Sequence, residues 1–425
     1  MRPWLRPAVA LLLLTPSVSH AQTLSQRFGQ LFTFGNCGEP LCLSVDVAGP
    51  HGLHFIPSVT QGENDLLGFL TGSISTSLAN LPFTAATGAT TFEFVDGAPV
   101  ASTVSAGGIF GERAQTLGRG RLLVGANVNA LSMERIRGRP LDDLLLRFAH
   151  QNVGGAAMGD PIFENDIIEV HSQLDINLLV TSVFASYGLL DNLDVGVLVP
   201  IVRASLSGTS EADVLAYLDT TPHLFGTAAN PSEFAEAAAS GSAVGIGDIA
   251  VRVKAALFRR PMFGLGLAAD VRLPTGDSAN FLGSGQTSVR VLGIMSGRSG
   301  NFSPHLNAGF AVRSGERQPN SAIGALGFDH LLSDHVTLAA DILADFALGD
   351  SPLHLPGFAV FDVPARRQVR LTDIPDRRDQ LVDGSIGFKM DVAGGYRAIT
   401  NLLVPMSDGG LRPRYLWTAG FERTF

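Results

Sequence analysis

His171 and Asp175 are the residues in this sequence that come nearest to an acid–base pair. They are four positions apart in a segment of alternating polarity, and on a strand that spacing separates them by roughly 13 Å. General acid–base catalysis needs its groups within hydrogen-bond reach, directly or through one water. The pair therefore cannot act alone as a catalytic dyad.

Other motifs of enzymes are absent from the sequence. It contains no Gly-x-Ser-x-Gly elbow, no His-Glu-x-x-His and no Gly-x-x-x-x-Gly-Lys. Its ten histidines are scattered and show no metal-ligand spacing. We therefore expect no catalytic residues, no metal site and no cofactor.

Cys37 and Cys42 are the only cysteines, in the short motif Cys-Gly-Glu-Pro-Leu-Cys. In an oxidising compartment a small local disulfide is the expected outcome. A metal-binding pair or a redox dithiol is the alternative, which no third ligand nearby supports.

Segments of about ten to fourteen residues with alternating polarity recur along the chain, as is typical of transmembrane barrel strands. The clearest covers 166–187, where apolar residues such as Ile168 and Val170 alternate with polar ones such as Glu169 and Gln173. We expect its apolar face to meet lipid and its polar face to meet water. The twelve candidate strands are 119–134, 166–187, 193–206, 244–259, 263–274, 286–298, 301–313, 321–332, 335–348, 381–392, 396–407 and 413–425.

This pattern predicts an all-β fold, a transmembrane antiparallel up-and-down β-barrel of about 12 strands, with 14 as the alternative. The connections alternate between short turns and longer loops, so both ends of the barrel are expected on the periplasmic side. Within the long connection at 207–243, residues 211–218 and 231–239 have the composition of short helices. That connection is expected to be a surface loop, or a lid over the barrel.

Charged residues on the polar faces of these segments are the candidates for the lining of the lumen. Against hydrocarbon each Arg or Lys would cost about 2–4 kcal/mol at mid-bilayer, so these side chains are expected inside. Two interpretations remain open, a salt-bridged lining that holds the barrel together and a lining that selects a solute. The candidates are Glu169, His171, Asp175, Asp248, Arg252, Lys254, Asp270, Arg272, Arg290, Arg313, Asp341, Asp345, Asp383 and Lys389.

The last segment places Tyr415, Trp417, Phe421 and the terminal Phe425 on one face of a strand. An aromatic residue that closes an alternating strand resembles the signal by which bacterial outer-membrane barrels are recognised for insertion. The resemblance implies two partners, the lipids of the outer membrane and the barrel-assembly machinery.

Residues 1–21 have the features of a secretory signal peptide, with Arg2 and Arg6 before an apolar core and Ser19-His20-Ala21 as a cleavage site. Its removal takes away two arginines and no acid, so the formal charge changes from −9 to −11. An acidic, exported chain is not expected to bind nucleic acid. The outer membrane of a Gram-negative bacterium is the expected location.

Residues 22–118 precede the predicted barrel at 119–425 and are rich in Gly, Ser, Thr and Ala. Two weak β-like runs lie at 74–81 and 90–95. The segment is expected on the periplasmic side or as a plug inside the barrel; an additional hairpin would give the 14-stranded alternative.

Two stretches carry a resemblance to a known family. The first covers 108–120 and includes Phe110, Glu112, Arg113 and Arg119; the second runs from Gly247-Asp248 through 273–277 to 282–285. Together they resemble, over about 105–425, the outer-membrane family of the MetA-pathway of phenol degradation. That family is similar in architecture to the transporters of long-chain fatty acids and aromatic hydrocarbons.

The resemblance implies passive uptake of small hydrophobic or aromatic solutes without an enzymatic step. A structural or adhesive barrel is the alternative, because long loops and a charged lining serve those roles as well. Arg113 and Arg119 are expected either to tether an inward-folded segment or to meet lipid phosphates at the rim.

Deleting Phe425 should impair insertion into the membrane if the closing strand is a recognition signal. The measurement is the fraction of folded barrel in the outer membrane, read from the heat-dependent shift in gel mobility. Assembly of the shortened chain at the normal level would contradict this interpretation.

Overall fold

The computed structural model describes residues 22–34, 39–43, 52–79, 91–95, 98–102, 106–151, 163–218, 221–315, 318–351, 353, 357–362 and 365–425. The predicted signal peptide at 1–21 and Cys37 lie outside these residues. Cys42 is disulfide-bonded.

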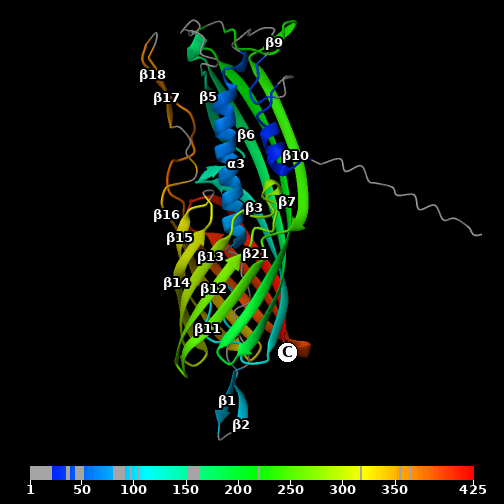
Figure 1. The fold of residues 1–425 in the computed structure, drawn as a ribbon, viewed down its shortest axis with the longest axis vertical. Helices are drawn as coiled ribbons and strands as arrows, with labels where there is room; N and C mark the ends of the chain where they lie inside the picture. The colour runs from blue at the N-terminus through cyan, green and yellow to red at the C-terminus, as the bar shows by residue number, and fades with distance from the viewer. Residues whose placement is uncertain are drawn as a thin grey trace, which may run out of the picture.

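Strands dominate the structure, and helices are confined to the N-terminal segment apart from short 3-10 turns (Figure 1). The helical elements are α1 (Leu24–Gln30), α3 (Ile56–Ala79), η2 (Phe163–Asn165), η3 (Ser278–Asn280) and η4 (Ala393–Gly395). The strands are β1 (Thr91–Val95), β2 (Ala98–Ser102), β3 (Leu122–Ile136), β4 (Arg139–Pro140), β5 (Leu144–Ala149), β6 (Ile167–Leu190), β7 (Leu193–Leu215), β8 (Phe225–Thr227), β9 (Asn230–Ser232), β10 (Phe234–Ile246), β11 (Ala250–Arg260), β12 (Phe263–Arg272), β13 (Ser288–Gly297), β14 (Phe302–Arg313), β15 (Asn320–Ser333), β16 (Val336–Leu348), β17 (Phe358–Phe361), β18 (Arg367–Arg370), β19 (Gln380–Val392), β20 (Tyr396–Pro405) and β21 (Leu411–Thr424).

The prediction of a closed antiparallel barrel of 12 strands is confirmed. Neighbouring strands pair in chain order from β11 to β16, continue through β19, β20 and β21, and β21 closes the ring on β3. Strands β10 and β11 lie end to end and together fill one position in the ring, since both pair with β7. Closure satisfies the backbone hydrogen bonds of every wall strand, which a bilayer requires.

The connection at 207–243 differs from the prediction. Residues 211–218 and 231–239 were expected to be short helices, but β7 continues to Leu215 and β10 returns beside it from Phe234. Alanine and glutamate favour helix in isolation, yet pairing with a neighbouring strand overrides that weak preference. The helical prediction is therefore wrong.

The polarity of β6 reverses along its length while the same face stays buried. Its even positions are buried, from Ile168 through Val180 to Phe184. Its odd positions face outward, and they are polar as far as Asn177 but mainly apolar from Leu179 onward. The outward face thus meets water at one end of the strand and lipid at the other.

The neighbouring strands reverse at the same level. Leu179 pairs with Arg203 of β7, and Arg203 pairs with Val244 of β10. On the outward faces, Ile201 and Ile246 lie on the apolar side of this level. The edge of the lipid-facing belt therefore crosses β6, β7 and β10 along one line.

This reversal corrects three predicted lumen residues. Glu169, His171 and Asp175 lie on the outward face of β6, beyond the lipid-facing belt, not in the lumen. Glu169 accepts a hydrogen bond from Nε of Arg147 on β5 at 2.5 Å and bonds Nε2 of His171 at 3.0 Å. Alternation showed that the two faces differ, but it could not show that the apolar face is covered by protein.

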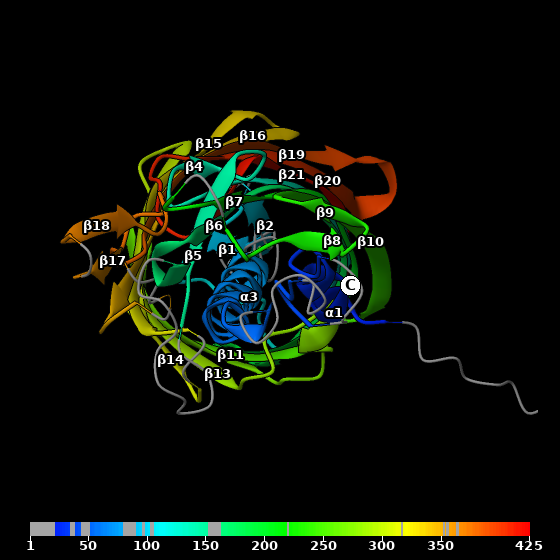
Figure 2. The ribbon, with the colours of Figure 1, turned by 90° about the horizontal axis from the view of Figure 1, so that it is seen from above.

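The protein that covers this face is the N-terminal segment. Leu24 and Phe28 of α1 and Phe69 of α3 form one buried cluster with Val170 and Leu206. Figure 2 shows α1 and α3 inside the ring of strands. Both helices lie at the end of the barrel opposite the C-terminus (Figure 1).

Helix α3 replaces the β-like run expected at 74–81. Its buried residues include Val59, Leu66, Leu70 and Ile74, which recur at helical spacing. Its hydroxyls donate to carbonyls four residues back, as from Ser75 to Thr71 at 2.8 Å, which lets a Ser/Thr-rich helix be buried. In the part of the chain that the structure describes, no helix has the length and apolar character needed to cross a membrane.

The run at 90–95 corresponds to β1, which pairs only with β2. This small hairpin lies beyond the barrel at the end where the C-terminus lies (Figure 1). It adds no strand to the ring, so the 14-stranded alternative does not hold.

Arginine placed at two positions on the outward face of β6 should have opposite effects. Gln173→Arg faces water and should change the free energy of unfolding by no more than about 0.5 kcal/mol. Val183→Arg faces lipid and should cost about 2–4 kcal/mol. Urea unfolding in vesicles measures both, and equal effects would contradict the position of the belt.

Candidate permeation pathway

The wall of the lumen carries a band of charged residues from β11, β12 and β13. Arg252 and Lys254 alternate with the exposed Val251 and Val253, which places the two cations inside. Asp270 lies opposite Arg252 in the strand register and accepts a bond from its Nη2 at 2.7 Å. Nε of Arg290 also donates to Asp270, at 2.9 Å.

Residues 106–118 cross this lumen without joining a strand; we call them the plug segment. Glu112 of the plug segment pairs with Arg252 and lies 3.2 Å from Nζ of Lys254. Both cations and Glu112 are buried. The segment thus supplies a carboxylate to a part of the wall that has more cations than acids.

The backbone of the plug segment is held by side chains of the wall. Asn307 of β14 accepts from the Glu112 amide at 2.6 Å and donates to its carbonyl at 2.9 Å. Ser296 of β13 accepts from the Ala114 amide at 3.1 Å. Asp194 of β7 accepts from the Leu117 amide at 2.9 Å. Buried polar groups that would otherwise be unpaired are satisfied in this way.

A second set of contacts surrounds Gly111. His305 bonds Asp341 at 2.6 Å through Nε2, and its Nδ1 lies 3.7 Å from Asp329. Nη1 of Arg113 lies 3.4 Å from the same Asp329. A Cβ at Gly111 would overlap the His305 ring and the Asp341 carboxylate. Only glycine lets the plug segment approach the wall this closely.

The remaining candidates divide between the wall and the rim. Asp345 pairs with Arg313, Asp383 pairs with Arg412, and Nζ of Lys389 donates to the Ala106 carbonyl at 3.1 Å. Phe110 packs against the cluster of Ile109, Ala339 and Ile399. Arg119 is exposed, and its amide donates to Asp191 at 3.4 Å, so Arg113 tethers the segment whereas Arg119 lies at the rim.

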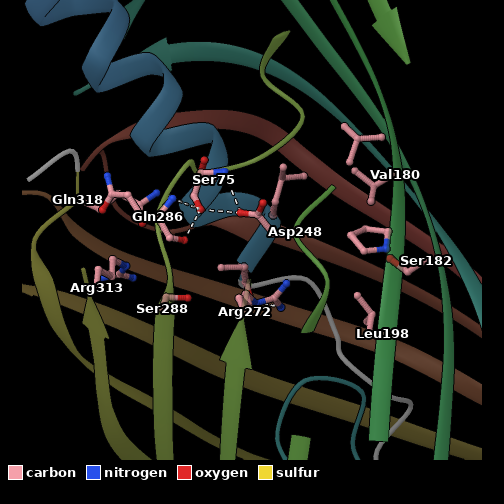
Figure 3. Close-up of a pocket in the computed structure, with 15 residues that line it drawn as sticks. Ser75, Val180, Ser182, Leu198, Asp248, Arg272, Gln286, Ser288, Arg313 and Gln318 are labelled. Atoms are coloured by element: carbon pink, nitrogen blue, oxygen red, sulfur yellow. Dashed lines mark hydrogen bonds between the residues drawn. The ribbon is translucent and has the colours of Figure 1, made fainter. Parts of the chain in front are cut away.

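A narrow cavity lies between the end of α3 and the wall; we call it the α3 pocket (Figure 3). Its residues are Ser75, Leu78, Ala79, Val180, Ser182, Leu198, Pro200, Val202, Asp248, Arg272, Ser284, Gln286, Ser288, Arg313 and Gln318. One side, from β6 and β7, is mainly apolar, and the other is polar. The cavity is small, with room for about two waters. The plug segment and the α3 pocket thus occupy neighbouring parts of the lumen.

Asp248 organises one wall of the α3 pocket. Its carboxylate accepts hydrogen bonds from the Gly276 amide at 3.0 Å, the Ser284 amide at 2.8 Å and the Ser284 hydroxyl at 2.6 Å. A Cβ at Gly283 would overlap this carboxylate. The glycines of the motif at 273–285 therefore serve close approach, and among them only Gly285 has a positive φ.

The aromatic residues of the closing strand lie as the alternation places them. Tyr415, Trp417, Phe421 and Phe425 are all exposed on the outward side of the barrel. Their exposure is consistent with contact with lipid. No group of three or more His, Cys, Asp or Glu side chains within the described ranges is arranged to hold a metal ion.

Fold and lining together define an antiparallel β-barrel of the transmembrane type with a plug segment in a charged lumen. Residues 168–348 match the family described as "Putative MetA-pathway of phenol degradation". This match confirms the resemblance over a shorter range than 105–425. It includes the motif around Asp248 but not the motif at 108–120. A search of curated protein sequences found no significant match.

Three of the solved structures to which this chain is similar illustrate the likeness. An outer membrane channel from Pseudomonas putida F1 is 12% identical, with 73% of this chain and 98% of that chain covered and a TM-score of 0.43. The P. putida toluene transporter TodX is 10% identical, with 72% and 89% covered and a TM-score of 0.30. A Pseudomonas aeruginosa FadL homologue is 12% identical, with 72% and 89% covered and a TM-score of 0.29.

Several residues of the site were missing from the prediction. Asn307, His305 and Asp329 hold the plug segment, and their inward parity on β14 and β15 was a usable signal. Asp194 has the same parity on β7 as the buried Leu198. Gly111 carried no signal of its own, because its role depends on what lies across the lumen.

Gly111→Ala should loosen the plug segment, because the added methyl group displaces His305 or Asp341. We expect more frequent or longer openings in planar bilayers and a loss of stability of about 1–3 kcal/mol. Gly68→Ala is the matched control, since a Cβ at Gly68 of α3 meets nothing within 4 Å. Identical single-channel records for the two variants would contradict the role of Gly111.

Proposed function

We propose that this protein is a passive outer-membrane channel for the uptake of small hydrophobic or aromatic compounds. The observation that carries the proposal is the way the lumen is closed. A segment without strand pairing fills it and is held by side-chain bonds, which can break and re-form without opening the wall. No energy source or cofactor is part of this proposal.

The class of solute is inferred from two features. The description of the family that matches 168–348 names a pathway of phenol degradation, and phenol is an aromatic compound. The α3 pocket offers an apolar side formed by Val180, Leu198 and Val202. An apolar surface beside a few polar groups is typical of sites for small organic ligands.

The rest of the predicted biology belongs to the same proposal. The mature chain would begin after residue 21 and enter the outer membrane of a Gram-negative bacterium through the assembly machinery, with Phe425 in the signal. Residues 22–118 would be the N-terminal segment of a barrel at 119–425, and the plug segment would be its part inside the lumen. The protein would carry out no reaction on its solute.

A reversible lock on the plug segment tests the proposal. A Cβ at Gly266 of β12 would lie 3.5 Å from Cβ of Ala114, within the range of a disulfide. Oxidised Ala114→Cys/Gly266→Cys should therefore stop passage, and dithiothreitol should restore it. The readout is accumulation of radiolabelled toluene by intact expressing cells, because simple lipid vesicles admit toluene unaided.

The controls separate the lock from other effects of the reagents. Ala114→Cys alone cannot form the lock, and the unmodified chain with dithiothreitol accounts for reduction at Cys42. Normal accumulation with the lock closed would overturn passage by movement of the plug segment. Accumulation equal to that of cells without the protein, in every state, would favour a structural or adhesive barrel.

A further inference from the structure

Arg272 differs from the other arginines of the charged lumen. Arg252 and Arg290 bond Asp270, Arg313 pairs with Asp345, and Arg412 pairs with Asp383. Arg272 is only 9% exposed, yet within the described residues it makes no ion pair. Its one hydrogen bond runs from Nη2 to the carbonyl of Ala79, at 2.8 Å.

Asp248, the acidic residue of the α3 pocket, is not an ion-pair partner of Arg272. Asp248 already accepts three hydrogen bonds from Gly276 and Ser284, none of them from Arg272. The pocket's other arginine, Arg313, is engaged by Asp345. The pocket therefore contains one guanidinium with unused donors and no carboxylate committed to it.

The present partner of Arg272 is a helix terminus. Ala79 is the last residue of α3, and the last carbonyls of a helix have no partner within the helix. They carry about half a negative charge in total. A carboxylate carries a full charge and accepts two parallel bonds from a guanidinium. It would therefore compete with Ala79 for Arg272.

The opposite side of the pocket suits an apolar body. Val180 of β6 and Leu198 and Val202 of β7 line it, and Figure 3 shows Arg272 across from Leu198. Ser182, Ser288 and Gln286 lie around these two features. Charge at one end and hydrocarbon at the other match a small amphipathic anion better than a neutral hydrocarbon or an inorganic ion.

We propose that the α3 pocket binds small organic carboxylates with an aromatic or other apolar body, and that Arg272 holds the carboxylate. Binding displaces the Ala79 carbonyl and frees the last turn of α3, which enlarges a cavity that has room for only about two waters. The inference deepens the proposed uptake function and rests on it for the role of the ligand as a solute. Binding itself can be measured without passage.

Equilibrium dialysis of the refolded mature protein in detergent, with radiolabelled benzoate as the probe, tests the site. Arg272→Met should weaken benzoate binding about 10- to 100-fold. Arg272→Lys keeps the charge and should retain part of the affinity. Arg203→Met is the matched control, because Arg203 faces outward and its loss should leave benzoate binding unchanged.

Benzyl alcohol serves as the neutral counterpart of benzoate. Its binding should differ little between the unmodified protein and Arg272→Met, since the apolar wall is intact in both. Equal benzoate affinity in the two proteins, or no benzoate binding to the unmodified protein at millimolar concentration, would overturn the proposal.

A second measurement needs no variant and covers the case in which Arg272→Met does not fold. Hydrogen exchange at residues 75–79 should become faster when benzoate is added and stay unchanged with benzyl alcohol. Unchanged exchange with both probes would overturn the displacement of Ala79. Toluene accumulation with normal dependence on the plug lock, but no benzoate binding, would reject this site and leave the proposed channel function standing.

Discussion

The buried cations and carboxylates of the lumen compensate one another's charge. Glu112 is one of these carboxylates, and it comes from the plug segment and not from the charged band of the wall. Arg252 and Arg290 already share Asp270. Removing one member of a buried ion pair leaves an uncompensated charge, which costs several kcal/mol. The plug segment is therefore part of the electrostatic balance of the barrel. A movement that takes Glu112 away from the wall leaves Arg252 with Asp270, and Lys254 opposite Asp194 of β7.

The hydrogen bonds that hold the plug segment explain how the lumen can be filled by a segment that is still able to move. Asn307, Ser296 and Asp194 bind the plug segment through side chains, whereas the wall strands bind one another through the backbone. Water can replace a side-chain bond when the lumen is wet, but lipid cannot replace a bond of the wall. The wall, which is bonded through its backbone, can therefore stay in place while the plug segment, which is bonded through side chains, moves.

The fold was largely predictable because the period of two is imposed by the strand itself. All twelve segments were recognisable, and the inward parity of Arg252, Asp270 and Asp345 followed from their positions. The predictions that failed depended on what lies against a given face of a strand. Val170 was expected to face lipid because no sequence pattern shows that α1 and α3 cover it. Residues 211–218 have a helical composition, and only the neighbouring strand determines that they extend β7.

The site was less predictable than the wall for the same reason. Gly111 and Gly283 are required by side chains that reach them from distant strands. Arg272 had the parity of a lumen residue, but that no carboxylate among the described residues forms an ion pair with it becomes visible only when the neighbours are placed. Parity identifies the face of a residue, and only the assembled ring identifies its partner.

Strand β6 has 24 residues, and about twelve of them lie beyond the lipid-facing belt, a height of roughly 40 Å if fully extended. There the outward side chains Gln173 and Asp175 contact neither lipid nor the buried cluster. Substitutions of Gln173 on that face are therefore expected to have little structural consequence. Changes to the outward side chains on that part of β6 therefore leave the α3 pocket untouched, because its β6 residues Val180 and Ser182 lie at the level of the belt.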